Sequence, residues 1–277
     1  MEHKRFHYKS MDELKQELTR IGVRLPLSDS LEALKREVKL GARTMHNSIA
    51  IQPMEGCDGT ADGRPAELTL RRYDRFARSG AGLIWAEAVA ITPEGRANPR
   101  QLWLTRDNLD DYKRFVYDMK QTCLKENGFE PIVIMQATHS GRYSKPEGVP
   151  APLIAYNNPI FEGDRPIAAD RILSDEYLYG LIDKFGVSAS LAEQAGFDGV
   201  DIKCCHRYLN SELLSAYDRE GDFGGSLENR TRLLRGGVAA AQAATGSDFI
   251  VTSRLNVYDG FPHPYGWGVR EGEGTEI

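Results

Sequence analysis

The 277-residue sequence lacks the features that mark several classes of protein. No apolar run approaches the roughly 20 residues that a membrane helix needs, and the first residues carry no apolar signal core. The net charge is −5, so no basic excess indicates nucleic-acid binding. The four cysteines form no CxxC pair and the histidines form no tract, which gives no support for a metal site. We therefore expect a cytoplasmic protein that binds no membrane, nucleic acid or metal.

The composition is that of an ordinary soluble globular protein, with 41% hydrophobic and 27% charged residues. Residues 1–40 are expected to form an N-terminal helical extension with two short, charged helices. A capping box at Ser10 begins the first helix, and the second extends to Val38. Residues 41–277 are expected to form the main domain.

Strand and helix patterns alternate regularly after residue 41. Near-continuous apolar runs predict five strands, at 48–53, 82–91, 131–137, 199–203 and 248–254. Helical spacing predicts the helices between them, at 65–80, 107–128, 174–196 and 226–246. The long stretch 139–172 is irregular, and loops of that length are usually functional. This alternation predicts an α/β fold, either an open doubly wound sheet or a barrel.

Polar side chains that handle protons follow the fourth strand. Lys203, His206 and Tyr208 come directly after the short apolar run 199–202. In parallel α/β proteins the carboxyl ends of the strands carry the chemistry. A catalytic site is therefore predicted here.

This region resembles the old yellow enzymes and relatives such as 2,4-dienoyl-CoA reductase. The resemblance rests on Lys203-x-x-His206-Arg-Tyr208-Leu and on Phe223-Gly-Gly-Ser-Leu-Glu-Asn-Arg230. The family has His-x-x-His/Asn-Gly-Tyr-Leu and Tyr-Gly-Gly-Ser-Leu-Glu-Asn-Arg. A lysine and Arg207 therefore stand where a histidine and a glycine are usual.

The resemblance spans roughly residues 38–270 and implies an FMN-dependent TIM-type (β/α)8 barrel. Only about five βα units are visible, so the barrel of residues 41–277 is expected to be incomplete and the chain truncated at its C-terminus.

The same resemblance implies a set of cofactor-binding residues, namely Pro53, Met54, Glu55, Ala88, Gln136 and Arg254. Glu55 takes the position of a Thr or Cys that tunes the flavin potential in relatives. The Gln136 amide can donate and accept at the pyrimidine edge, and Arg254 would stabilise the charge at flavin N1. The alternatives are a satisfied core amide for Gln136 and an ordinary ion pair for Arg254.

For catalysis the resemblance implies that Lys203 and His206 bind the substrate carbonyl oxygen. Tyr208 would donate a proton to the substrate carbon, because a phenol with an ordinary pKa of about 10 is protonated at neutral pH. In the alternative interpretation Lys203 pairs with Asp201 or Glu55, and Tyr208 is a packed aromatic residue.

The implied function is hydride transfer from NAD(P)H through FMN to an activated alkene of a small molecule. FMN-dependent amine oxidation or demethylation is the second enzymatic interpretation. The third is an inactive, truncated family member that cannot hold FMN alone. Homo-oligomerisation stays open.

Overall fold

The computed structural model describes residues 5–272 and contains a parallel sheet of five strands. The strands are β3 (Ala50–Ile51), β4 (Leu83–Ala90), β5 (Ile132–Thr138), β6 (Gly199–Ile202) and β7 (Ile250–Thr252). They lie side by side in chain order. A doubly wound sheet reverses its strand order at a switch point, whereas a barrel adds its strands in sequence. The strand order therefore selects the barrel from the two predicted alternatives.

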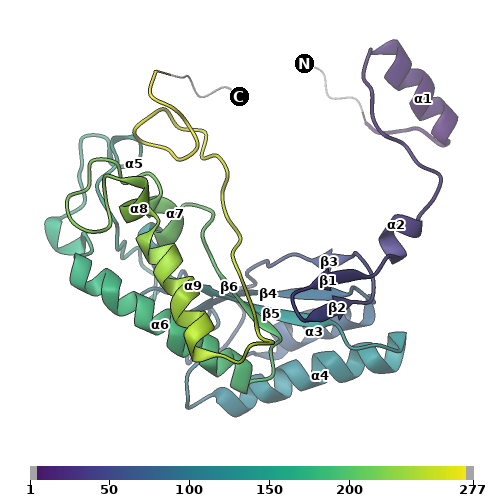
Figure 1. Cartoon of the computed structure of the whole chain (residues 1–277), viewed down its shortest axis with the longest axis horizontal. Coiled ribbons are helices and arrows are strands. Elements are labelled where there is room, and N and C mark those ends of the chain that lie inside the picture. The colour runs from purple at the N-terminus through teal and green to yellow at the C-terminus, as the bar shows by residue number, and fades with distance from the viewer. Residues whose placement is uncertain (1–4, 273–277) are drawn as a thin grey trace.

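Four long helices fill the connections and lie along one side of the sheet (Figure 1). They are α3 (Glu67–Arg78), α4 (Leu109–Asn127), α6 (Asp175–Gln194) and α9 (Arg232–Ala244). The main hydrophobic core lies between these helices and the sheet, and its largest buried side chains include Tyr73, Tyr112 and Phe185. All residues of β5 and β6 are buried, as their apolar sequences predicted. The four helices between the predicted strands are confirmed.

The opposite side of the sheet carries an antiparallel hairpin of β1 (Val38–Leu40) and β2 (Arg43–Met45). Met45 packs there with Leu83, Ile132 and Ile250, which are the first residues of β4, β5 and β7. The hairpin thus covers the amino-terminal end of the sheet and leaves the carboxyl end for the site.

The predicted extension of the second helix to Val38 is wrong. The helix α2 (Glu32–Lys35) ends earlier, and Val38 starts β1. Gly41 adopts a φ of +62°, which allows the tight turn of the hairpin. Val38 then packs beside the buried hairpin core, so tertiary contacts override the helical spacing.

The N-terminal helix α1 (Met11–Arg20) lies apart from the sheet in Figure 1. Ser10 Oγ accepts a hydrogen bond from Glu13 N at 3.2 Å, which confirms the predicted cap. None of the ten residues of this described helix is buried. The boundary between the extension 1–40 and the domain 41–277 stays a prediction. The hairpin crosses it, because β1 lies before residue 41 and β2 lies after it.

Shorter elements follow the carboxyl ends of the strands. The helices are α5 (Pro159–Glu162), α7 (Leu209–Leu213) and α8 (Leu227–Arg230), and the 3-10 turns are Gly141–Tyr143 and Ala169–Arg171. Ser226, the first residue of the predicted helix 226–246, caps α8 by accepting from Asn229 N at 3.2 Å. The predicted helix is interrupted between α8 and α9. The helix α7 was not predicted. Among the described residues no helix combines the length and apolarity needed to cross a bilayer.

Candidate active site

One buried carboxylate gathers side chains and backbone from three neighbouring strands and from the segment after a fourth. Asp201 on β6 is 0% exposed and accepts hydrogen bonds from Gln136 Nε2 at 2.5 Å and Trp85 Nε1 at 3.1 Å. Its other oxygen accepts from the backbone N–H of Arg254 at 2.7 Å. The strand register places Ala88 beside Gln136. Residues from β4, β5, β6 and the segment after β7 therefore meet at one point.

The environment of Asp201 determines its proton affinity. Burial raises its pKa to about 6, although the hydrogen bonds from Gln136, the Arg254 backbone and Trp85 act in the opposite direction. The Gln136 side chain is itself buried, and its amide nitrogen is engaged by Asp201. This contact leaves the amide oxygen of Gln136 as the end available to a ligand.

A second carboxylate joins the end of β3 to the turn after β6. Glu55 accepts from Lys203 Nζ at 2.8 Å and from Tyr208 OH at 3.1 Å. The Lys203 ammonium lies 3.7 Å from the centre of the Tyr208 ring, a distance at which cation–π attraction operates. Of the two partners weighed for Lys203, the structure has Glu55, while Asp201 holds Gln136. Burial and the Glu55 charge raise the pKa of Tyr208 far above its ordinary value, so the phenol stays protonated.

The loop that carries Glu55 is held by a separate set of contacts around Glu87 and Arg72. Gly56 N donates to Glu87 Oε2 at 2.8 Å, and Arg72 bridges Glu87 and Asp58. A Cβ atom on Gly56 would lie 2.3 Å from the Arg72 guanidinium, so a larger residue would displace that guanidinium from its ion pairs. The network fixes the position from which Glu55 reaches Lys203.

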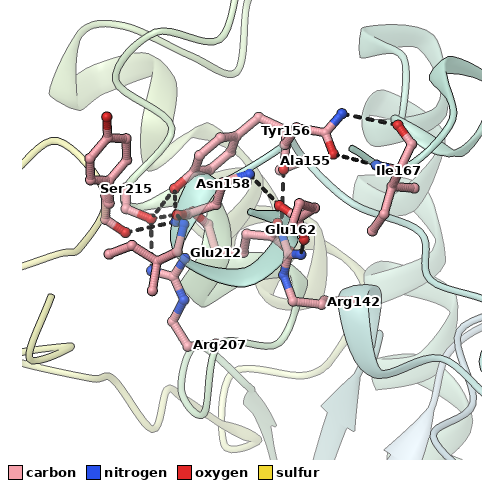
Figure 2. A network of polar contacts seen from close by, with 12 residues as sticks. Arg142, Ala155, Tyr156, Asn158, Glu162, Ile167, Arg207, Glu212 and Ser215 are labelled. Carbon is pink, nitrogen blue, oxygen red and sulfur yellow. Dashed lines mark hydrogen bonds and ion pairs between the residues drawn. The ribbon is translucent and has the colours of Figure 1, made fainter. Parts of the chain in front are cut away.

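The turn after β6 contains two consecutive left-handed residues. His206 and Arg207 have φ values of +61° and +57°, a conformation that disfavours residues with a Cβ. Arg207 is buried and donates from Nη1 to Ser215 Oγ at 2.8 Å (Figure 2). The same nitrogen donates to Asp259 Oδ2 at 2.6 Å. Arg207 stands at the position where the resemblance in Sequence analysis has a glycine. Its contacts with Ser215 and Asp259 thus hold the turn that carries His206 and Tyr208.

Figure 2 shows the rest of this polar network. Arg142 bridges Glu162 on α5 and Glu212 on α7, and Tyr156 shares a hydrogen bond of 2.7 Å with Ser215. Glu212 is 0% exposed, and burial raises its pKa to about 6. Sequence reasoning missed this network, and its one available signal was the arginine at a glycine position.

The sequence-predicted site residues fall into two groups in space. In the first group Gln136 and the Arg254 backbone donate to Asp201, and Ala88 is paired with Gln136 on the neighbouring strand. In the second group Lys203 and Tyr208 donate to Glu55. Pro53 lies just after β3 and is buried, whereas the Met54 side chain is 66% exposed.

His206 is exposed and lies edge-on to Tyr208, with 6.4 Å between ring centres. Partial desolvation by its neighbours and the nearby cations Lys203 and Arg254 lower the pKa of His206, which favours the neutral imidazole. Among the described residues there is no cluster of three or more side chains able to hold a metal ion.

Comparison with known families matches residues 35–265 to the NADH:flavin oxidoreductase / NADH oxidase family. The chain belongs to this family. The NADPH dehydrogenase of Halalkalibacterium halodurans is 32% identical over 197 residues, which make up 69% of this chain and 54% of the relative. The NADPH dehydrogenase of Clostridium acetobutylicum is 29% identical, over 78% of this chain and 61% of the relative. The chain therefore spans little more than half the length of these two curated relatives.

Solved structures give the same fold. The old yellow enzyme homologue from Zymomonas mobilis superposes with a TM-score of 0.67 at 27% identity, over 80% of this chain and 63% of that one. A complex of 2-naphthoyl-CoA reductase with 2-naphthoyl-CoA superposes with a TM-score of 0.73 over 85% of this chain and 36% of that one. At 22% identity this second likeness concerns the fold alone. The predicted family and the predicted TIM-type barrel fold are confirmed.

Members of this family use FMN, with NAD(P)H as the reductant. The residues at the Asp201 end of the site fit a flavin ring. Arg254 Nη1 is buried without a hydrogen-bond partner within the described chain, so this cation lacks an acceptor that an electron-rich ring edge would supply. Ala88 is small, but at 0% exposure it is covered by protein atoms, so a ring could reach it only after those atoms move.

Proposed function

We propose that the protein is an FMN-dependent oxidoreductase that passes hydride from NAD(P)H to an activated alkene. The observation that carries this proposal is the Asp201 contact set, because it joins Gln136 on β5 to the Arg254 backbone after β7. Family membership and the NADPH dehydrogenase relatives support the same reaction class.

Five of the six predicted cofactor-binding residues would contact the flavin ring, and the sixth, Glu55, would affect its reduction potential. Pro53, Met54 and Ala88 would lie against the ring, and the Gln136 oxygen would accept from a ring N–H, because its amide nitrogen is held by Asp201. Arg254 would face the pyrimidine edge, where a permanent cation stabilises negative charge. Glu55 is proposed to affect the ring through its charge, since its oxygens are bonded to other side chains.

Bound FMN would supply the chemistry of hydride acceptance from NAD(P)H and hydride donation to the β-carbon of the alkene. Lys203 and His206 would orient the substrate by donating to its carbonyl oxygen, which stabilises the enolate that develops there. Tyr208 would give its phenolic proton to the α-carbon. Its raised pKa keeps that proton on the oxygen before the reaction.

The setting and organisation of the protein are part of the proposal. We propose a cytoplasmic protein, supported by four cysteines that are all free in the structure. Residues 1–40 would form an extension to the barrel domain 41–277, supported by the exposed helix α1. A homo-oligomer is compatible with this organisation, and the substrate would be a small molecule.

The test separates the two half-reactions in a Tyr208→Phe variant. Flavin reduction by NAD(P)H should keep its rate, because the phenol is not needed for that step. Alkene reduction should slow by 10²-fold or more, which is the lower range for loss of a general acid. Stopped-flow absorbance of the flavin measures both. Equal rates in the variant and the unaltered protein for both steps would reject the role of Tyr208, and failure of the protein to take up FMN would reject the proposed function.

A further inference from the structure

Glu55 lies where two hydrogen-bond donors of the site converge. One of its carboxylate oxygens accepts from Lys203 Nζ at 2.8 Å and the other from Tyr208 OH at 3.1 Å. The two donors come from one turn and touch each other through the Tyr208 ring. Together they form a binding site shaped for a carboxylate, with one donor for each oxygen.

We propose that Glu55 is an internal ligand of this carboxylate site, and that a ligand bearing a carboxylate binds there by replacing it. This inference rests on the proposed function in taking Lys203 as a group that meets the substrate oxygen and Tyr208 as a group that faces the substrate. An external carboxylate can take over both hydrogen bonds with unchanged charge. A neutral carbonyl leaves the Lys203 ammonium without a counter-charge, so the site favours anionic ligands.

Burial explains why Glu55, and not Lys203, is the exchangeable partner. The Lys203 side chain is 3% exposed and the Glu55 side chain is 18% exposed. A displaced Glu55 lies at the solvent side and regains water, whereas a buried ammonium without an anion is strongly unfavourable. Lys203 is therefore most stable opposite a carboxylate, supplied either by Glu55 or by the ligand.

The loop that bears Glu55 has its own supports, which do not depend on Lys203. Gly56 is bonded to Glu87, and Arg72 holds Glu87 and Asp58 together. Loss of the Glu55 contact therefore leaves the loop attached to the barrel. This makes exchange at Glu55 a local event at one side chain.

Isothermal titration calorimetry with benzoate and the uncharged analogue benzamide tests the inference at pH 7. The Glu55→Gln variant keeps the side-chain size but removes the competing charge. We expect benzoate to bind at least tenfold tighter than to the unaltered protein, equivalent to about 1.4 kcal/mol, and benzamide affinity to change less. Glu94→Gln is the matched control, because Glu94 also accepts from a tyrosine, Tyr177 OH at 2.6 Å, but is not bonded to Lys203. Its benzoate affinity should be unchanged.

A Glu55→Gln variant that binds benzoate no tighter than the unaltered protein, or no detectable binding to either, overturns the inference. If that variant fails to fold, Glu55→Asp replaces it, because the shorter acid keeps its charge but cannot reach both donors. It too should bind benzoate more tightly, and an unchanged affinity overturns the inference. FMN uptake is measured separately by flavin fluorescence. If the protein takes up FMN but the Glu55 variant binds benzoate with unchanged affinity, only the role of Glu55 as an internal ligand is rejected. If the variant binds benzoate more tightly but the protein takes up no FMN, only the proposed function is rejected.

Discussion

Arg207 offers a sharp test of the turn that carries the proposed catalytic residues, because its side chain and its backbone have opposite effects on stability. The side chain is paired with Asp259, whose own side chain is 0% exposed. Removing one partner of a buried ion pair costs about 3–5 kcal/mol. Asp259 keeps its hydrogen bonds from Asn256 Nδ2 at 2.9 Å and Trp267 N at 3.0 Å, so we expect Arg207→Ala to lose about 3 kcal/mol.

The backbone of Arg207 adds an effect of the opposite sign. Its φ of +57° disfavours any residue with a Cβ by about 1–2 kcal/mol, while glycine adds about 0.5–1 kcal/mol of unfolded-state entropy. Arg207→Gly should therefore be more stable than Arg207→Ala, by up to about 1.5 kcal/mol. Both variants lose the same ion pair, so their difference isolates the backbone.

Urea unfolding followed by circular dichroism gives the free energy of unfolding of both variants. Lys113 provides the control, because it lies within the regular helix α4 with an exposed ion pair to Asp110. There the glycine variant should be less stable than the alanine variant by about 1 kcal/mol. If glycine is also the less stable residue at position 207, the left-handed turn is refuted.

Two further predictions concern the Asp201 end of the site. The raised pKa of Asp201 means that the folded state binds its proton more tightly than the unfolded state, so this stabilisation is present below pH 3.8 and is lost as the pH rises to about 6. Between pH 4 and pH 6 the free energy of unfolding should therefore fall by about 2 kcal/mol more in the unaltered protein than in Asp201→Asn. Equal falls would contradict the raised pKa. Arg254→Met should make the potential of bound flavin more negative by tens of millivolts, where 30 mV corresponds to about 1.4 kcal/mol for two electrons. Spectroelectrochemistry measures that shift, and an unchanged or more positive potential would contradict a cation at the ring edge.

Local signals in the sequence were sufficient for most element boundaries. Ser174 and Ser226, at which two helices were predicted to begin, are the N-caps of α6 and α8, because an N-cap bond is formed within four residues. The apolar runs of β4 and β5 identify strands covered on both faces. Val38 was misassigned because its partners on the sheet are distant in sequence.

The candidate site was only partly predictable for the same reason. Motif resemblance identified Gln136 and Lys203, but it left the partner of Lys203 open. Glu55 is 148 positions away from Lys203, and their pairing depends on the closeness of β3 and β6 strand ends in space. The contact of Arg207 with Asp259 likewise joins segments 52 positions apart, which no spacing rule connects.

The central claim is that the strand ends around Asp201 converge on a single flavin ring. Titration of the purified protein with FMN, followed by quenching of flavin fluorescence, tests it most directly when repeated with Gln136→Leu and Arg254→Met. The account predicts a yellow protein that takes up one equivalent of FMN, with affinity reduced at least tenfold in each variant. A colourless protein without uptake, or uptake that is unaffected by both substitutions, would contradict it.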